Sequence, residues 1–479
     1  MKARLYKIHR ILSLIVFIPV ILWSLSGILH PVMANWFRIQ PAERFLKQAP
    51  FEADSSRLSP QDVCQLNQID AFQNIKMVYV DQKEYYQVKT DNQLQYFDTH
   101  DATELIDGDK LYAQFLARYY AGDTVSPINN VELITEYTGQ YKVINRLLPV
   151  YKVSFEREDG MDVYVETSSS GLGTMNDKYR KSYLWLFSNF HNWDFLGKNV
   201  WVKSTAILLF SISVFITGIL GLIIYWKNWK TFRLQKKKNP NLTLRKRHRK
   251  ISLATSIFLL AFAFSGGFHT FMKYDSIRLN DYEPSISFSS QDFKVPLSAI
   301  MEQSGPISKM GIVKYQGNPF FRIQDTAKHS SPKYYSVLNG QEIPGADRNY
   351  AVQRAAQILA ADENDVLETE PIFKYNHEYG FINKRLPVWK VTFKSNPDKS
   401  CYIETASGIP GAIVDASDQL EGASFSFLHK YHMLDFMGKG WRDLLLSLAA
   451  FSLVVISLTG FAIWMKVRKK QKTKSQVSS

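Results

Sequence analysis

Cysteine is almost missing from this chain of 479 residues, which contains only Cys64 and Cys401. Two cysteines are too few for a disulfide-rich scaffold, or for a zinc or iron–sulfur centre held by thiolates. The sequence also lacks a Walker loop, a glycine-rich dinucleotide fingerprint, an HExxH pair and a catalytic-triad signature. It therefore gives no sign of a hydrolase or a nucleotide-binding enzyme, and it leaves a disulfide between the two cysteines open.

Acidic residues are missing from the three most basic stretches of the chain. Residues 1–10, residues 227–250 and the tail from Lys466 together hold 21 of the 58 Lys and Arg residues and no acid. The formal net charge is +14, which by itself could suggest nucleic acid. No basic domain with interleaved aromatics or a recognition motif accompanies this charge, so we expect no nucleic-acid partner.

The basic stretches flank four long segments that are almost free of charge. These segments are 11–33, 205–226, 251–272 and 444–465. A helix of about 20 apolar residues crosses the 30 Å hydrocarbon core of a bilayer. The sequence therefore predicts four transmembrane helices. The positive-inside rule places both termini and the middle loop in the cytoplasm, with contact to anionic lipid heads as a second use of the charge.

The chain repeats itself at an offset of about 240 residues. The matching segments are Lys7–His30 with Lys246–His269, Ile144–Phe155 with Ile382–Phe393, and His191–Lys198 with His432–Lys439. Because the order is the same in both halves, we interpret the chain as a tandem duplication of one unit: helix, external domain, helix. Such a parallel repeat predicts a pseudo-two-fold axis along the membrane normal.

The two external segments have an α+β pattern. Short alternating runs predict strands at 78–80, 85–89 and 94–97, paired strands at 150–155 with 162–166, and their counterparts at 388–393 with 400–404. Amphipathic helices are expected at 111–120 and 350–360. The predicted order is residues 1–34 (amino terminus and first helix), 35–204 (external domain), 205–226 (helix), 227–250 (basic loop), 251–272 (helix), 273–443 (external domain), 444–465 (helix) and 466–479 (basic tail).

Seven of the ten histidines lie near the ends of the predicted helices. They are His9, His30, His191, His248, His269, His429 and His432. Within each half, two of them stand 21 residues apart, about 31 Å along a helix, so each odd-numbered helix carries one histidine at each membrane face. Neutral imidazole is the usual nitrogen ligand of haem iron, and no cysteine or acid accompanies these histidines, as zinc or copper would favour.

The repeat suggests how the histidines pair around haem. His9 and His248 are equivalent and are predicted to hold a haem at the cytoplasmic face. At the outer face the pair is His30 with His269 or His191 with His432, and the sequence neither chooses between them nor excludes pairing within one half of the chain. His429 aligns with Ser188 in this scheme and is a weaker candidate. The plain alternative is that single histidines cap helices or snorkel at the interface.

Several neighbouring residues have two possible roles. Ser26-Gly27 and Ser265-Gly266 would admit a flat macrocycle or a closely packed helix. Asp194 and Asp435 would orient an imidazole or cap the following turn. Arg146 and Arg385 would meet an anionic chelate or form salt bridges.

These residues resemble the PepSY-associated transmembrane family of bacterial inner-membrane proteins linked to iron uptake, including its ferric-siderophore reductase members. The resemblance rests on the basic-HR element at Lys7–Arg10, the SGxxH elements ending at His30 and His269, the HxxDF elements beginning at His191 and His432, and the LPVYKVSF and LPVWKVTF strands. It covers nearly the whole chain. Its histidine pattern is more specific than its strand pattern.

The resemblance implies one or two haem b groups in a four-helix core with two PepSY-like periplasmic domains. Electrons would pass outward and reduce ferric iron in a siderophore or similar chelate. No fused flavin module is expected, so the electron donor would be separate, either a quinol or a cytoplasmic reductase. The alternative is a membrane-anchored PepSY module that binds or regulates a protein such as a peptidase and has no redox activity.

Overall fold

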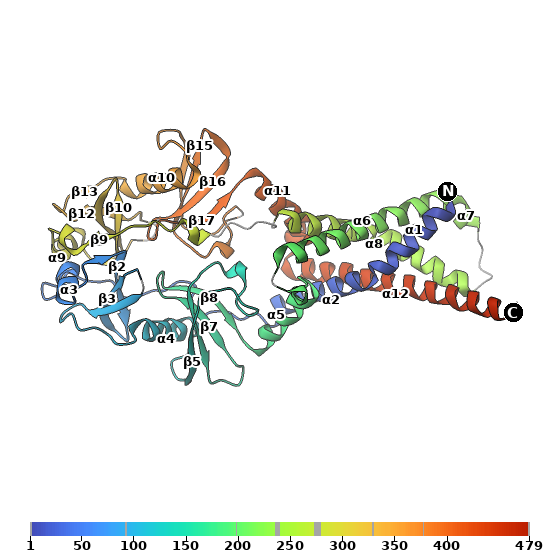
Figure 1. The fold of residues 1–479 in the computed structure, drawn as a ribbon, viewed down its shortest axis with the longest axis horizontal. Helices are drawn as coiled ribbons and strands as arrows, with labels where there is room; N and C mark the ends of the chain where they lie inside the picture. The colour runs from blue at the N-terminus through green and yellow to red at the C-terminus, as the bar shows by residue number, and fades with distance from the viewer. Residues whose placement is uncertain are drawn as a thin grey trace. The chain divides into compact units, whose positions relative to one another are not determined.

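The computed structural model describes residues 2–91, 93–197, 199–234, 240–272, 279–327, 330–376 and 378–477 (Figure 1). They form two compact units, each built from both halves of the chain. The helical unit comprises Met1–Arg38, Tyr179–Ser276 and Ser417–Ser479, and the β-rich unit comprises Ile39–Lys178 and Ile277–Ala416. Lys198, residues 235–239 of the predicted basic loop, and residues 273–278 lie outside the described residues.

The helical unit contains the four predicted membrane helices. Its helices are α1 (Lys2–Ile15), α2 (Phe17–Trp36), α5 (Lys178–Phe190), α6 (Val200–Lys227), α7 (Trp229–Leu234), α8 (Pro240–Met272), α11 (Ala416–Ser424) and α12 (Lys439–Val477). Short helical turns connect them: η2 (Asp194–Leu196), η6 (Phe425–His429) and η7 (His432–Met437). Helices α2, α6, α8 and α12 are long and apolar enough to cross a membrane, which confirms the prediction of four spans.

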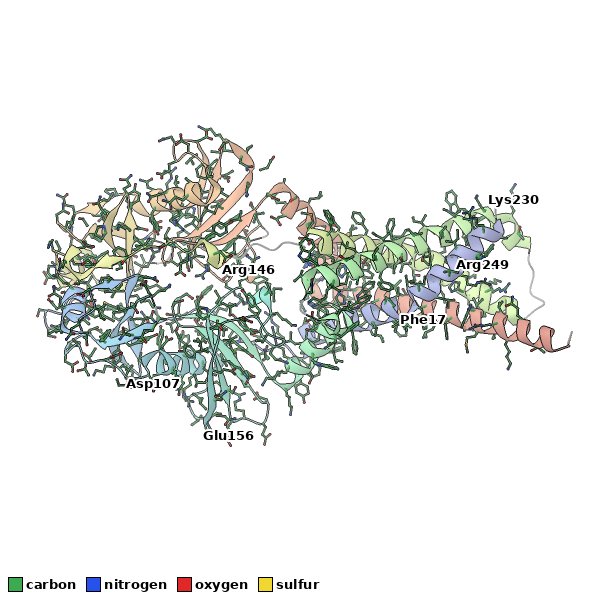
Figure 2. The ribbon with its side chains drawn as sticks, in the orientation of Figure 1. Phe17, Asp107, Arg146, Glu156, Lys230 and Arg249 are labelled. Carbon is green, nitrogen blue, oxygen red and sulfur yellow. The ribbon has the colours of Figure 1, made fainter. Side chains whose placement is uncertain are left out.

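The four long helices pack side by side around an apolar centre. Helix α6 lies against α8, and α12 lies against both α2 and α8. Val16, Val20, Val214 and Leu453 are buried together where they meet. The start of α1 and the end of α12 lie at the same end of this unit (Figure 1), where Figure 2 also labels Lys230 and Arg249. We call this the basic end and the other the opposite end.

The first predicted helix is broken. The sequence favoured one helix over 11–33, but α1 ends at Ile15 and α2 begins at Phe17. Pro19 explains the break, because it has no N–H for the carbonyl of Ile15 and its ring crowds that carbonyl. His9 therefore lies on α1, and His30 lies on α2.

Two four-stranded antiparallel sheets in the β-rich unit have the same strand order. One runs β5 (Ile128–Ile134), β6 (Val150–Phe155), β7 (Asp162–Glu166), β8 (Gly171–Asn176), and the other β14 (Val366–Ile372), β15 (Val388–Phe393), β16 (Asn396–Glu404), β17 (Ile409–Val414). Helix α4 (Gly108–Ala121) covers the first and α10 (Ala346–Leu359) the second, each through one buried apolar face. The predicted strand pairs and both predicted helices are present, with ends that differ by a few residues.

The remaining sheets bring the two halves of the chain together. They are β2 (Asn74–Val80), β3 (Lys83–Lys89), β4 (Leu94–Asp98); β10 (Ile307–Tyr315), β11 (Asn318–Asp325), β12 (Lys333–Ser336), β13 (Glu342–Ile343); and the pair β1 (Ala71–Phe72) with β9 (Phe288–Ser289). With α3 (Pro60–Leu66) and α9 (Leu297–Ser304) they enclose one hydrophobic core drawn from both halves. Cys64 is buried in this core and Cys401 under α10, and both are free thiols, which answers the open question of a disulfide.

A buried ion cluster joins the two four-stranded sheets. Arg385 donates to Glu404 on β16 at 2.7 Å and lies 3.6 Å from Glu166 on β7, and all three side chains are buried. Burial raises the pKa of Glu166 more than Arg385 lowers it. Burial also raises the pKa of Glu404, but Arg385, Ser407 and Lys309 outweigh it and hold that pKa below its ordinary value. Arg385 is thus occupied by internal carboxylates.

Arg385→Met is expected to weaken the β-rich unit strongly. Removing one partner of a buried ion pair leaves uncompensated buried charge and typically costs about 3–5 kcal/mol. Hydrogen exchange of the β7 and β16 amides in the full-length protein would measure the loss. Lys47→Ala, which removes an exposed pair with Glu43, is the control and should leave that protection unchanged. Wild-type protection in Arg385→Met would contradict this reading of the cluster.

Candidate functional site

The structure places the histidines of the helical unit at its two ends. His9 on α1 and His248 near the start of α8 lie at the basic end. His30 on α2 and His269 near the end of α8 lie at the opposite end. His248 and His269 share one continuous helix, so 21 residues separate them by about 31 Å along its axis.

At the basic end, each histidine is held through Nδ1 by a threonine of a long helix. His9 Nδ1 lies 3.2 Å from the backbone carbonyl of Thr217 on α6. His248 Nδ1 lies 3.1 Å from Thr459 Oγ1 on α12, and that hydroxyl already donates to the carbonyl of Val455. A carbonyl, or a hydroxyl whose proton is in use, can only accept. Both imidazoles therefore carry their proton on Nδ1, and each keeps a free lone pair on Nε2.

Glycine lets these two rings lie close to the helix backbone. A Cβ atom at Gly460 would stand 3.3 Å from His248 Cε1, tighter than ordinary packing, and one at Gly221 would stand 3.5 Å from His9 Cε1. The basic end therefore contains both histidines that the sequence paired.

At the opposite end, two further histidines are held in the same way by buried serines. His191 Nδ1 lies 3.0 Å from Ser26 Oγ, and His429 Nδ1 lies 3.1 Å from Ser265 Oγ. Each serine donates its own proton to a carbonyl one turn earlier, Ser26 to Leu22 and Ser265 to Ala261, both at 2.7 Å. The serines therefore accept from the imidazoles, which again leaves Nε2 unprotonated in both rings.

The rings of His191 and His429 lie close to each other. Their centroids are 6.3 Å apart, and their planes are nearly perpendicular at 88°. Two imidazoles on opposite sides of one metal, each with a metal–nitrogen bond of about 2 Å, have ring centroids about 6 Å apart. Burial lowers the pKa of His191 to about 4 and that of His429 to about 3, with neighbouring histidines as a further cause. Both rings are therefore neutral near pH 7, as a metal ligand must be.

Phenylalanine rings separate this pair from the other two histidines. Phe425 stacks on both His429 and His269, with centroids 4.6 and 4.5 Å away. Phe187 stacks on His191 at 4.4 Å and is tilted toward His30 at 6.3 Å. His269 Nδ1 lies 2.5 Å from the buried carboxylate of Glu421. The rings of Phe187 and Phe425 thus disfavour pairing within one half of the chain.

His429, and not His432, takes the place that corresponds to His191, which corrects the sequence alignment. His432 is 38% exposed, and its Nδ1 lies 2.8 Å from both Asp435 and Arg442. The second half contains three extra residues, 432–434, that shifted the alignment. The pattern F-S-x-x-H, which ends at His191 and at His429, recurs at an offset of 238 and could have revealed the true counterpart.

The two aspartates of the HxxDF elements have different contacts. Asp435 lies within hydrogen-bond distance of His432 Nδ1, and Arg442 approaches the same nitrogen. Asp194 instead pairs with Lys203 at 2.9 Å. Arg146 donates to the carbonyl of Gly411 within the β-rich unit.

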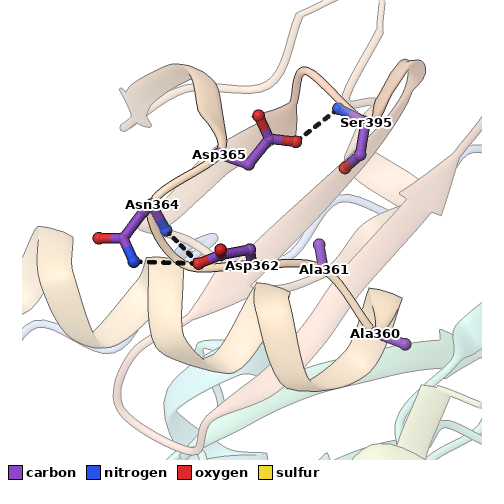
Figure 3. Close-up of a pocket in the computed structure, with 6 residues that line it drawn as sticks. All are labelled: Ala360, Ala361, Asp362, Asn364, Asp365 and Ser395. Carbon is purple, nitrogen blue, oxygen red and sulfur yellow. Dashed lines mark hydrogen bonds between the residues drawn. The ribbon is translucent and has the colours of Figure 1, made fainter.

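A pocket of about 440 Å³ in the β-rich unit is lined by Ala360, Ala361, Asp362, Asn364, Asp365 and Ser395 (Figure 3). Its carboxylates are used locally. Asp362 accepts from the backbone and side-chain nitrogens of Asn364, and Asp365 accepts from the backbone of Ser395. These bonds shape the loops, so we place the candidate site at the histidines of the helical unit.

The donor set of the helical unit consists of histidine pairs. Among the described residues, no three or more His, Cys, Asp or Glu side chains are grouped so that they could hold one metal ion. Protein zinc sites use three or four such ligands. A pair of imidazoles instead suits a metal whose other positions are filled by a cofactor, as in haem.

The fold and these histidines define a membrane protein with a four-helix span and a β-rich unit of α+β type. Residues 6–333 match the family model described as the PepSY-associated TM region, and the chain belongs to that family. No curated protein matches the sequence.

The hydrogen bonds predict one tautomer for four histidines. In protein labelled with ¹⁵N-histidine and prepared without cofactor, His9, His191, His248 and His429 should each show a protonated Nδ1 and an unprotonated Nε2. Ser265→Ala should return the His429 signal to a mixture of tautomers, because the ring loses its acceptor. Solid-state NMR of the two nitrogen shifts measures this. Signals from protonated Nε2 in the wild-type protein would refute the assignment.

Proposed function

We propose that the protein carries haem b in its helical unit and passes electrons across the membrane to ferric iron held in a siderophore or similar chelate. One observation carries the proposal: histidines at both ends of the bundle have Nδ1–H committed to a fixed acceptor and Nε2 free. This is the state in which histidine binds haem iron, because the outer hydrogen bond fixes the ring and raises the basicity of the ligating nitrogen.

Two haem groups fit the residues. His9 and His248 would hold one at the basic end. His191 and His429 would hold the other at the opposite end, supported by their 6.3 Å separation and their equivalent serine acceptors. His30 and His269 remain the second candidates at that end. Haem supplies the one-electron chemistry, while the chain orients the imidazoles and keeps water from them.

The charge distribution supports an orientation for the conduit. The basic stretches adjoin one end of the bundle, so that end would face the cytoplasm of a bacterium and both termini would lie there. The β-rich unit, which continues from the opposite ends of the helices, would then be periplasmic. The matching strand orders and the matching histidine–serine contacts of the two halves support a tandem duplication.

The chemistry of the substrate follows from this direction of electron flow. Siderophores hold ferric iron through hard oxygen donors, and reduction to ferrous iron weakens that binding without breaking the chelator. The chain would draw electrons from a separate donor at the cytoplasmic face, a quinol or a cytoplasmic reductase. The competing function is a PepSY module that binds or regulates a protein partner, and such a module would contain no bound chromophore.

His429 and His432 provide a matched pair of substitutions. His429→Ala and His191→Ala should each lower the haem content from about two to about one per chain, because bis-histidine ligation needs both imidazoles. His432→Ala should keep both haems, since its ring is exposed and bonded to Asp435. Pyridine-haem quantitation and the low-spin absorption bands of the purified variants measure the difference. Loss of haem in His432→Ala with full retention in His429→Ala would reverse the assignment.

Electron transfer across the membrane can be tested in liposomes. The haem-loaded protein is reconstituted, with a reductant at the basic end and a ferric siderophore at the opposite end, separated by the bilayer. We expect ferrous iron to form on the siderophore side, and His248→Ala to abolish it. If the fully loaded wild-type protein fails to reduce the chelate, the proposed electron transfer across the membrane is wrong.

A further inference from the structure

A serine, a lysine and a tyrosine meet at one point in the first half of the β-rich unit. Ser170 stands in the turn before β8, Lys76 lies on β2, and Tyr112 lies on α4. Ser170 Oγ is 3.1 Å from Lys76 Nζ and 2.7 Å from Tyr112 Oη. Three separate elements thus bring a hydroxyl, an amine and a phenol into contact. A serine hydroxyl beside a lysine amine is an arrangement that enzymes use for nucleophilic acyl transfer.

The contacts of Lys76 suit an amine that can gain and lose a proton. Its Nζ lies 2.9 Å from the backbone carbonyl of Thr167 and 2.7 Å from that of Ser168. An uncharged amine has two N–H bonds, which these carbonyls accept, and one lone pair, which remains for the Ser170 hydroxyl proton. The protonated form is also satisfied, since an ammonium donates to all three oxygens. Burial, followed by the charge of Lys309, lowers the pKa of Lys76 to about 7. Much of the amine is therefore uncharged near neutral pH.

Two tyrosines of α4 position the serine. Burial raises the pKa of Tyr112, so its phenol keeps its proton near pH 7 and donates to Ser170 Oγ. Tyr120 donates to the backbone carbonyl of Ser170 at 2.7 Å. Ser170 is only half-buried, and the adjacent Ser168 and Ser169 are exposed, so this turn is open to solvent.

The second half of the chain builds the same turn without the serine and the lysine. Gly408, before β17, stands where Ser170 does, at an offset of 238. When the hairpins β2–β3 and β10–β11 are aligned on their turns, Gly311 stands where Lys76 does. Gly408 and Ser170 have the same left-handed backbone, with φ of 72° and 59°, which glycine adopts readily and serine rarely. The fold therefore needs neither the hydroxyl nor the amine, and Ser170 occupies a position that suits glycine better.

We propose that Ser170 is a nucleophile activated by Lys76, and that it takes an acyl group from a carboxylic ester. The proton of Ser170 Oγ moves to Lys76 Nζ as Oγ bonds to the carbonyl carbon, and the alkoxide of the ester leaves with that proton. Water then gives one proton to Lys76 and bonds through its oxygen to the acyl carbon. Ser170 Oγ recovers the proton as the carboxylic acid leaves. This activity is separate from the proposed haem function, so a protein without haem would leave it standing.

The test is covalent labelling of the full-length protein in detergent with a fluorophosphonate, a reagent that traps activated serines. Mass spectrometry of the peptides should locate the label on Ser170. Ser170→Gly, which reproduces the turn of the second half, should remove it. Lys76→Arg keeps the charge and the donors but cannot deprotonate, so labelling should slow by roughly a hundredfold. Lys314→Arg, the same substitution at an exposed lysine of β10, is the matched control and should label like the wild type.

The pH dependence of labelling provides a measurement that needs no variant. Because only the uncharged amine accepts the proton, the wild-type rate should rise as the pH increases through about 7 and then level off. Hydrolysis of p-nitrophenyl acetate should follow the same profile and disappear in Ser170→Gly. Absence of label on Ser170, ester hydrolysis that persists in Ser170→Gly, or an unchanged rate in folded Lys76→Arg overturns the proposal. If Lys76→Arg does not fold, the wild-type profile decides, and a rate that does not change near pH 7 overturns it.

Discussion

The candidate site depends on one kind of hydrogen bond, from a histidine Nδ1–H to an oxygen atom that can only accept. The carbonyl of Thr217 has no proton to donate. The hydroxyls of Ser26, Ser265 and Thr459 each donate their proton to a carbonyl of the preceding turn of their own helix. Within an apolar bundle such bonds are costly to break, because the freed groups find no water. They therefore determine both the orientation and the protonation of the rings, and leave Nε2 on the side of each ring away from the acceptor.

The same contacts explain why serine, threonine and glycine lie next to the histidine rings. Serine and threonine in a membrane helix commonly bond back to the carbonyl four residues earlier. That bond satisfies the hydroxyl proton and leaves the oxygen lone pairs facing the neighbouring imidazole. Glycine at 460 lets the His248 ring approach the backbone of α12. Small residues thus supply an acceptor or the space for a ring, in addition to packing.

Much of the fold could be predicted from the sequence, because its signals are local. The four spans follow from length and hydrophobicity, and β6, β7 and β15 begin and end where the alternation of side chains does. All the histidines of the candidate site could also be named from the sequence, but His429 was ranked as a weaker candidate than His432. The role of His429 depends on which residues face Ser265 across the bundle, a contact 164 residues apart in the chain.

Other features were hidden for similar reasons. Arg385 reaches Glu166 more than 200 residues earlier, so only the folded chain shows that it is unavailable to a ligand. Lys76 and Ser170 are 94 residues apart, so no local motif signals them, and only the folded chain brings the amine and the hydroxyl together.

The most direct test of the central claim is a dithionite-reduced minus oxidised absorption spectrum of the purified full-length protein, with pyridine-haem quantitation. The proposed function predicts low-spin b-type bands and about two haems per chain, because two pairs of histidines would supply the axial ligands. A folded but colourless protein, produced with ample haem, would contradict it and favour the PepSY binding module.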